Sequence, residues 1–414
     1  MRGYDEQMKR IYLDHASATP VDSGVSRVVA EALRKYTGNP SALHAEGKAA
    51  RVALEGARTK IATVLAAHFD EIVFTSGATE ANNMAISGVV QAARARGIER
   101  PHVVVSAIEH PSVLECVRAM EAEGTRVDYL VVDARGLIDT KELRKLITPE
   151  TVLVSIMYAN NEIGAIEPVR EIAKEIRHAR KVNQSAYPYF HTDAAQAGNY
   201  LDVNVLRLGV DMMTLSSGKT YGPRGIGALF IKRGVHMAPI MHGGEHERGR
   251  RPGTEPVAIA VGFAEVFAHA EKIKAKESAR VAKLRDMLAE KILKKILGTS
   301  VNGDLANSLP NILNISFEGV ESETLVLYLD AAGIAVSGKS ACKSSSEEPS
   351  HVILAIGRVR EERAGLPAVT SAQAGAGRFS LGRGTKREDI AYVAKELARI
   401  IPFLREARAQ SDVT

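Results

Sequence analysis

The chain contains, at residues 72–94, the stretch IVFTSGATEANNMAISGVVQAAR, in which a short apolar run is followed by a polar turn and a helical pattern. The run 72–74 is apolar and mostly β-branched, whereas residues 79–94 have amphipathic helical spacing. The residues between them are small and polar, as is typical of a turn. The stretch therefore predicts one strand–turn–helix unit.

Similar units recur up to about residue 235, and segments such as 169–180 again have helical spacing. Alternating strands and helices favour a mostly parallel sheet with helices on both faces, so we predict an α/β fold with a seven-stranded sheet. Ligands of such folds bind at the carboxyl ends of the strands, so the turns that follow the strands are the candidate sites. The other predicted strands are 102–105, 127–132, 152–157, 189–191, 212–215 and 227–231.

The pattern changes after about residue 260. Residues 260–296 are rich in Ala, Lys and Glu and predict one or two helices. Strands and helices then alternate to the end of the chain, which predicts a smaller α+β unit. Residues 358–377 show no clear period and predict a long loop.

The composition is that of an ordinary globular protein, with 45% hydrophobic and 25% charged residues in 414. Two cysteines exclude a disulfide framework and a multi-thiolate metal centre, so we expect no metal site and a reducing, cytoplasmic location. A net charge of +5 is a weak bias for this length, and we expect no direct nucleic-acid partner. We expect no membrane partner either, because apolar runs stay well below the roughly 20 residues of a transmembrane helix. The first residues, MRGYDEQMKR, lack the apolar region of a secretory signal.

The turn at residues 75–80 has the features of a phosphate site. Its small residues allow a bound group to approach the backbone, and the following helix start offers free N–H groups. An ordinary capped helix start, with Ser76 or Thr79 as the cap and Glu80 beside it, is the more frequent explanation of such a turn taken alone.

Two other strand-end turns carry residues that could hold a cofactor. Lys219, among the small residues of 216–223, could bind an aldehyde cofactor covalently. Asp193, at the end of a predicted strand, could pair with a protonated heterocyclic nitrogen. The alternatives are a surface lysine in a turn and an aspartate that caps a helix.

His110 and the turn at 160–164 occupy equivalent positions in the predicted topology. His110 follows a predicted strand and could stack on a planar cofactor or transfer protons. The alternative for His110 is a turn histidine that precedes a helix. For 160–164 it is an ordinary turn, in which Asn and Gly are present only because turn conformations favour them.

The two cysteines differ in their surroundings. Cys116 lies at helical spacing among apolar residues and is predicted to be a core residue. Cys342 lies in a polar stretch between Lys339 and Lys343, which would favour its thiolate. An incidental surface cysteine is the alternative for Cys342.

Residues 333–340, GIAVSGKS, match the nucleotide-binding pattern G-x-x-x-x-G-K-[ST]. That pattern needs a strand before it and a helix after it. Here a helical stretch, 324–332, precedes it, and its own interior is strand-like. We therefore predict that the match is not a phosphate-binding loop.

Taken in order, these turns resemble the motifs of the cysteine desulfurases, pyridoxal-phosphate enzymes of the class V aminotransferase group. The resemblance covers nearly the whole chain, and although each motif is weak alone, their ordered set is specific. The polar loop around Cys342 is similar to that of the long-loop branch of the family. The motifs are 11–16 (IYLDHA), 38–41 (GNPS), 75–80 (TSGATE), 109–110 (EH), 160–164 (NNEIG), 193–196 (DAAQ), 219–225 (KTYGPRG), 243–254 (GGEHERGRRPGT), 340–342 (SAC) and 378–383 (RFSLGR).

The resemblance implies the type I fold of pyridoxal-phosphate-dependent transferases. Its large, cofactor-binding domain would comprise residues 20–262. Residues 1–19 and 263–414 would form a small domain that carries the loop with the catalytic cysteine.

The resemblance also implies roles for individual residues. Lys219 would bind pyridoxal phosphate covalently, Asp193 would pair with its ring nitrogen, and His110 would stack on the ring and transfer protons. Arg378 would bind the substrate carboxylate in a bidentate pair, with Asn161 beside it. The remaining implied cofactor contacts are Asn161 and Gln196 at the ring and its 3-hydroxyl, Ala78, Thr79, Ser216 and Gly218 at the phosphate, and Thr254 from the partner subunit of a homodimer.

The implied activity is removal of sulfur from L-cysteine. The Cys342 thiolate would attack the substrate sulfur, so that the enzyme keeps a persulfide and releases L-alanine. The persulfide would pass to a sulfur-acceptor protein, either an iron–sulfur scaffold or a thiolation enzyme.

The chain departs from the family pattern at several positions. Gly218 stands where a histidine usually contacts the phosphate, His15 where asparagine is usual, and Pro252 where serine is usual. Lys343 directly follows the cysteine, and the stretch 358–377 is longer than the resemblance leads us to expect. Because the lysine, aspartate, histidine, cysteine and arginine are all present, we predict an active enzyme.

Three rival functions remain open at this point. A selenocysteine lyase, or a lyase for another amino acid, could use the same scaffold. Gly218 is compatible with a homologue that binds a partner without catalysis. The match at 333–340 leaves a nucleotide hydrolase as the third alternative.

Overall fold

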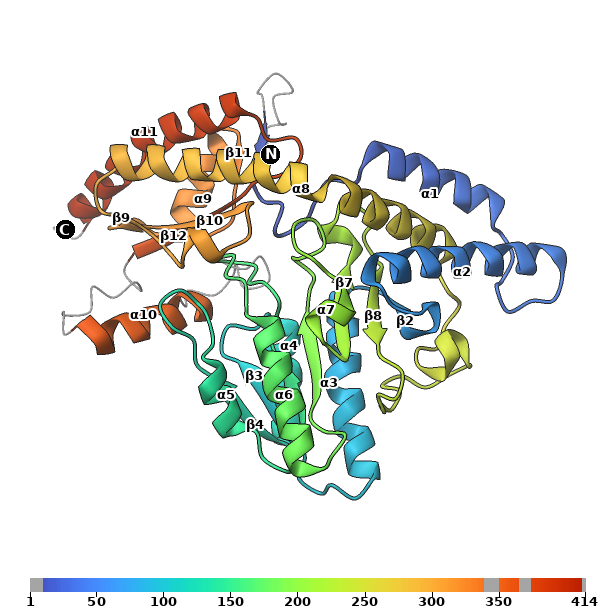
Figure 1. The fold of residues 1–414 in the computed structure, drawn as a ribbon. Coiled ribbons are helices and arrows are strands. Elements are labelled where there is room, and N and C mark those ends of the chain that lie inside the picture. The colour runs from blue at the N-terminus through green and yellow to red at the C-terminus, as the bar shows by residue number, and fades with distance from the viewer. Residues whose placement is uncertain (1–9, 339–349, 365–373, 412–414) are drawn as a thin grey trace.

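The computed structural model describes residues 10–338, 350–364 and 374–411, and its centre is a seven-stranded sheet (Figure 1). The strand order is β2-β8-β7-β6-β5-β3-β4. Only β8 runs antiparallel to its neighbours in this sheet, so the predicted mostly parallel α/β fold is confirmed. The strands are β2 (Ile72–Thr75), β3 (His102–Ser106), β4 (Arg126–Leu130), β5 (Thr151–Ser155), β6 (Tyr189–Asp193), β7 (Met212–Ser216) and β8 (Gly227–Ile231).

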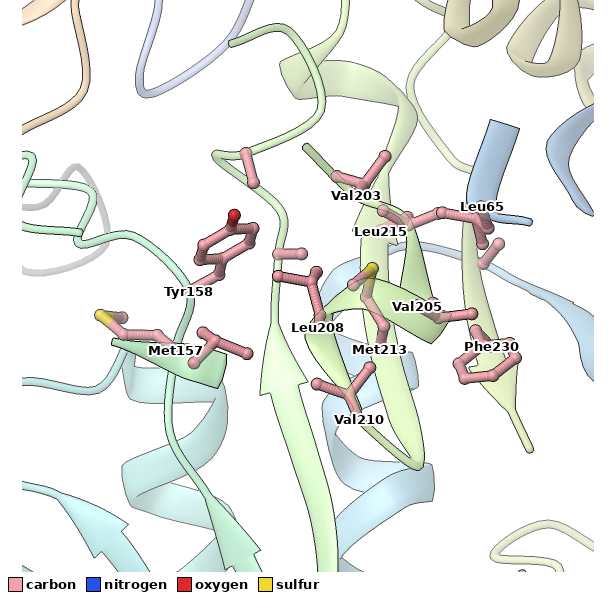
Figure 2. Packing of buried hydrophobic residues seen from close by; sticks show 14 of the residues in the cluster. Leu65, Met157, Tyr158, Val203, Val205, Leu208, Val210, Met213, Leu215 and Phe230 are labelled. Atoms are coloured by element: carbon pink, nitrogen blue, oxygen red, sulfur yellow. The ribbon is translucent and has the colours of Figure 1, made fainter. Parts of the chain in front are cut away.

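Helices cover both faces of this sheet because its strands are apolar on both sides. On β7, Met212 packs into the core under α3 and α4, whereas Met213 packs into the core on the opposite face. Figure 2 shows Met213 and Phe230 on that second face, close to Val205. Each fully buried side chain of this size contributes about 1.5–3 kcal/mol to folding. The helices of this part are α1 (Ser23–Lys35), α2 (Ala45–Leu65), α3 (Ala78–Ala95), α4 (Pro111–Ala122), α5 (Thr140–Leu146), α6 (Val169–Asn183) and α7 (Val205–Leu208).

A single long helix, α8 (Val257–Lys295), leads from the large sheet to a second core. Its first turns bury Phe263 and Phe267 in the large core, and its last turns bury Leu288 and Ile292 in the second one. The one or two helices predicted at 260–296 are therefore one helix. The domain boundary at residues 262 and 263 stays a prediction, because α8 runs through it.

The second core lies between two small sheets and the helices that follow them (Figure 1). One sheet is a parallel pair, β1 with β11, and the other has the antiparallel order β12-β10-β9. The elements are β1 (Ile11–Tyr12), β9 (Thr299–Val301), β10 (Ile312–Glu318), α9 (Ser322–Ala331), β11 (Ile334–Ala335), β12 (Ala374–Ser380) and α11 (Arg387–Ser411). Between β11 and β12, α10 (His351–Ala364) buries its apolar residues in the large core instead.

The prediction of a long loop at residues 358–377 is wrong at both ends. Its first residues continue α10 as far as Ala364, and its last residues, 374–377, form the start of β12. Small residues have low strand propensity, so no strand was predicted at residues 374–377. They are required by packing, because a Cβ on Gly375 would lie 2.3 Å from the Val320 carbonyl oxygen.

The segment that matches the nucleotide-binding pattern has the wrong surroundings as far as the structure describes it. Helix α9 precedes it, and β11 starts directly after Gly333. Lys339 and Ser340 lie outside the described residues. In the described part of the chain, no helix is both long and apolar enough to cross a membrane.

Candidate active site

A pocket of about 330 Å³ opens where the carboxyl ends of the parallel strands meet the N-terminal segment and β12. Nine of the predicted site residues line it, contributed by turns far apart in the sequence. They are Ala78, Thr79, His110, Asn161, Asp193, Gln196, Ser216, Lys219 and Arg378.

The N-terminus of α3 forms one end of the pocket. Gly77 is its cap residue and is extended, and no described side chain caps the helix. The predicted alternative, a cap by Ser76 or Thr79, is therefore not what the helix uses. Free N–H groups and the positive end of the helix dipole make this end suitable for an anion. Glu80 accepts from the Ser76 N–H at 2.5 Å, and its charge is balanced by Arg251 at 2.8 Å.

Asp193 ends β6 with its carboxylate in the pocket and is 7% exposed. Its Oδ1 accepts from the Ala195 N–H at 2.9 Å, and its Oδ2 accepts from Asn82 Nδ2 at 2.7 Å. No α-helix begins at Asp193, so it does not have the helix-capping role that was its alternative. A carboxylate held by two donors is suited to pair with a cationic ring nitrogen.

His110 is both a pocket residue and the cap of α4. Its Nδ1 accepts from the backbone N–H of Ser112 at 3.1 Å. Burial lowers the pKa of His110 below its ordinary value, and the nearby Asp193 carboxylate offsets this only in part. The ring is therefore neutral at pH 7, with its proton on Nε2, because Nδ1 acts as an acceptor.

Lys219 and Gln196 meet at the end of the motif 11–16, to which the sequence analysis gave no role in holding these side chains. Lys219 Nζ donates to the carbonyl oxygens of Ala16, at 2.7 Å, and Ser17. Gln196 Nε2 donates to the same Ala16 oxygen at 2.9 Å. The lysine is thus directed into the pocket rather than exposed on a surface turn.

Arg378, on β12, is 2% exposed and closes the pocket from the second core. Its Nη2 donates to Asp14 Oδ1 at 2.7 Å and to Ser17 Oγ at 2.6 Å, while Nη1 donates to the Asn161 carbonyl oxygen at 3.0 Å. Its Nε is buried and has no hydrogen-bond partner among the described residues. The guanidinium thus lines the pocket with its Nη atoms held by three described partners.

Three predicted residues do not line the pocket as described. Gly218 lies behind it, and its carbonyl oxygen accepts from the Thr19 N–H at 3.0 Å. Thr254 is exposed in the segment between Gly249 and α8. Cys342 lies outside the described residues.

Both ends of the segment that contains Cys342 are anchored at this pocket. Ser337 and Arg378 exchange backbone hydrogen bonds, with the Arg378 N–H 2.7 Å from the Ser337 oxygen. At the other end, His351 Nε2 lies 2.9 Å from the Glu109 carbonyl oxygen, next to His110.

Glu109 is a buried carboxyl group that sequence reasoning did not assign. Its Oε1 accepts from Ser106 Oγ and from the Met157 N–H, both at 2.7 Å. Burial raises the pKa of Glu109 to about 8, so the group is largely protonated at pH 7. As a protonated carboxyl it links the turns after β3 and β5 without adding charge to the pocket.

Three other functional residues were also missed. Asp14 pairs with Arg378, and Asn82 and Ser112 join Asp193 to His110. Asn82 had one readable signal: it is an amide at a position that helical spacing assigns to the buried face of α3. The Asp14–Arg378 pair had none, because it joins positions at opposite ends of the chain.

The set of donors fits pyridoxal phosphate. An uncapped helix end suits its phosphate, a fixed carboxylate suits its ring nitrogen, and a lysine amine between them suits its aldehyde.

Comparisons with known proteins agree with this geometry. Residues 11–393 match the family Aminotransferase class-V. The chain is 43% identical to "Cysteine desulfurase IscS" of Dictyoglomus turgidum and 42% identical to that of Methanosarcina thermophila. Both matches cover 96% of this chain, and they cover 96% and 93% of the two relatives, respectively. It is also similar to the solved structure of a "NIFS-like protein", with a TM-score of 0.85 and 33% identity over 95% of this chain and 100% of the other.

Proposed function

The chain belongs to the class V aminotransferase family and is a pyridoxal-phosphate-dependent cysteine desulfurase, and on this premise we propose how its pocket removes sulfur from L-cysteine. The single observation that carries the proposal is the convergence of Lys219, Asp193, His110 and Arg378 on one pocket. Each of these residues comes from a different part of the chain, and each has the chemistry that the reaction needs.

Pyridoxal phosphate, when bound, withdraws electrons from the substrate's α-carbon and so weakens the bond between Cβ and sulfur. Lys219 is the amine that binds the cofactor, and Asp193 orients it through the ring nitrogen. The contacts proposed for the rest of the cofactor are Asn161 and Gln196 at the ring, and Ala78, Thr79, Ser216 and Gly218 at the phosphate.

His110 is proposed to transfer protons at its Nε2. Because Nδ1 accepts from the Ser112 N–H, the ring proton is on Nε2. The lowered pKa of His110 keeps the ring neutral at pH 7, so its Nε2–H offers a hydrogen bond to the ligand, and the proton that the ring releases later in the cycle is one that it has first taken up.

Arg378 is proposed to bind the carboxylate of L-cysteine, with Asn161 beside it. Its place in the pocket lining supports this role, since a guanidinium pairs with a carboxylate through charge-assisted hydrogen bonds. Asp14 and Ser17 hold the other side of the guanidinium, so the side chain is already positioned before substrate binds.

Cys342 is proposed as the nucleophile. It is the fourth residue after Gly338, and the described residues on either side of its segment, Ser337 and His351, contact Arg378 and Glu109 at the pocket. Its thiolate attacks the substrate sulfur, an S–S bond forms, and the bond between that sulfur and Cβ breaks. The substrate carbon keeps the electron pair and takes up a proton to give alanine, while the enzyme retains the persulfide.

The partners follow from the same premise. Thr254 is exposed, which supports its proposed contact with the cofactor phosphate of the second subunit in a homodimer. The persulfide is proposed to pass to an acceptor protein, an iron–sulfur scaffold or a thiolation enzyme. A cytoplasmic location stays a prediction based on the two cysteines.

The test is to supply the purified protein with pyridoxal phosphate, L-cysteine and a thiol reductant, and to quantify alanine and sulfide. We expect both products in equal amounts. Selenocysteine is the second substrate in this test, because a selenocysteine lyase is the alternative function. Turnover of selenocysteine with no alanine from L-cysteine would overturn the proposal, as would a loaded protein that turns over neither substrate.

We expect Gly218→His to tighten cofactor binding by about tenfold, since a hydrogen bond to a charged group contributes about 1.5–3 kcal/mol. A Cβ at this position would lie 3.6 Å from Arg224 Cγ, which is ordinary contact, so the side chain can be accommodated. Fluorescence titration of the cofactor-free protein with pyridoxal phosphate measures the change. Gly56→His, at an exposed position of α2, is the matched control. Unchanged affinity in Gly218→His would show that the phosphate lies elsewhere.

A further inference from the structure

Asn82 is a fully buried amide in the second turn of α3. It lies behind the pocket and does not line it, and its neighbours Ala81, Ala85 and Ile86 on the same helix face are apolar core residues. An amide among such neighbours costs desolvation energy unless it is hydrogen-bonded. Its contacts therefore need a physical reason.

Both protons of the Asn82 amide are used in the pocket wall. Nδ2 donates to Asp193 Oδ2 at 2.7 Å and to Ser112 Oγ at 2.8 Å. The amide orientation follows from chemistry, because an ionised carboxylate only accepts and would repel the amide oxygen. Oδ1 is left buried without a hydrogen-bond partner among the described residues.

The second contact extends to His110. Ser112 Oγ lies 2.8 Å from His110 Nδ1, which also accepts from the Ser112 N–H. Since Asn82 donates to the hydroxyl oxygen, the hydroxyl proton is free to donate to Nδ1. With Nδ1 as the acceptor, the amide donates to the hydroxyl, and the hydroxyl donates to the imidazole.

A purely structural role explains these contacts poorly. An apolar side chain of similar size would fill the same space and would avoid the unsatisfied Oδ1, whose burial costs about 1–3 kcal/mol. The amide instead connects two groups that line one pocket, Asp193 directly and His110 through Ser112. Few other side chains can donate two hydrogen bonds in this geometry and remain uncharged.

We propose that Asn82 is a positioning residue that, through Ser112, fixes Asp193 and His110 relative to each other. Held on one amide, the carboxylate and the imidazole cannot rotate independently. The inference rests on the proposed function, because it gives both groups their task. Asn82 itself touches neither substrate nor cofactor.

The first test uses the cofactor-free protein, so that it does not depend on turnover. Nitrogen-15 NMR of histidine-labelled protein reports the tautomer and the pKa of His110. A donor to Nδ1 favours the neutral ring, so we expect Asn82→Ala and Ser112→Ala each to raise this pKa by about half a unit or more. The charged and titratable groups around the ring, Asp193, Lys219, His351 and Arg378, are the same in all variants.

The double variant tests whether the two residues act in one chain. If Asn82 acts through Ser112, the double variant shifts the His110 pKa no further than the larger single variant. Asn302→Ala is the matched control. This substitution also removes a buried amide that donates to two acceptors, Asn314 Oδ1 and Ser316 Oγ. Asn302, however, directly follows β9 of the three-stranded sheet, away from the pocket residues. We expect this control to lower the melting temperature without moving the His110 pKa.

The loaded enzyme gives a second readout. We expect Asn82→Ala to lower kcat by about tenfold with KM for L-cysteine unchanged, and to alter the pH dependence of the cofactor's visible absorption. If Asn82→Ala lowers only the melting temperature and leaves the His110 pKa and the absorption as in the wild type, the proposal is overturned. Failure of the wild type to form alanine would instead count against the proposed function, and the NMR result would still stand.

Discussion

Replacement of Cys342 by alanine is expected to abolish alanine formation from L-cysteine, by about a thousandfold or more, while the cofactor still binds. The loss is large because the residue supplies the reacting sulfur, and catalytic nucleophiles are not replaced by their neighbours. We expect cofactor binding to persist, since the described residues that line the pocket come from other turns. The measurement is alanine per enzyme over time, together with mass spectrometry for one added sulfur atom on the wild type.

The other cysteine provides the control for this substitution. Cys116 is 6% exposed in α4, its Sγ lies 3.3 Å from Ser87 Oγ, and burial raises its pKa, so it is a poor nucleophile. Cys116→Ala should retain activity and should carry the added sulfur after reaction with L-cysteine. If Cys342→Ala kept wild-type turnover, the sulfur would be leaving the substrate by another route, and the assignment of the nucleophile would be wrong.

The anchored ends of the segment give this prediction its structural basis. One end is bonded to Arg378, the proposed carboxylate site, and the other contacts the turn that carries His110. Helix α10 continues from the second end and buries Val352 and Ile356 in the large core. The described residues on either side of the segment, Ser337 and His351, thus lie beside the pocket that the proposed nucleophile has to reach.

The sequence predicted which residues meet in the pocket wherever a single strand-end turn carries a chemically distinctive side chain. Lys219, Asp193 and His110 each follow a strand, and the rule that parallel strands place such turns at one edge brings them together. Turn chemistry alone did not separate Asn160 from Asn161. Asn160 uses its Oδ1 to hold the turn, accepting from the Glu162 and Ile163 N–H groups, whereas Asn161 lines the pocket.

The sequence failed where a residue's role depends on a distant partner. The residues around Asp14 do not indicate its role, because that role depends on its contact with Arg378. Asn82 shows only an unexpected amide on an apolar face, and its partners come from two other turns. The strand at 374–377 is likewise selected by the close approach of Val320 to Gly375 rather than by strand propensity.

The second large effect concerns stability, and its source is a buried ion pair between Arg58 of α2 and Glu247. Their side chains are 2% and 1% exposed and are joined by two hydrogen bonds, at 2.7 and 2.9 Å. Glu247 also accepts from the Phe74 N–H of β2 at 3.0 Å. The pair thus fastens the segment that leads to Thr254 against the sheet.

Glu247→Ala is expected to destabilise the protein by about 3–5 kcal/mol, because it leaves the Arg58 charge buried without its main partner. Chemical denaturation followed by circular dichroism measures the loss. Glu175→Ala is the matched control, since Arg144 and Glu175 form the same two-bond fork at 2.5 and 2.9 Å but the arginine is 59% exposed. An exposed pair of this kind contributes about 0–1 kcal/mol.

The double variant Arg58→Met/Glu247→Leu separates the ion pair from the packing. Replacing both charges by apolar groups removes the unpaired charge, so we expect most of the stability to return. Thr254 follows the same segment, so a loosened segment should also weaken cofactor binding in the proposed homodimer. We therefore expect Glu247→Ala to lower both the stability and the affinity for the cofactor. Equal destabilisation by Glu247→Ala and Glu175→Ala would mean that the buried pair adds nothing beyond its exposed counterpart, and that the segment before Thr254 is held by other contacts.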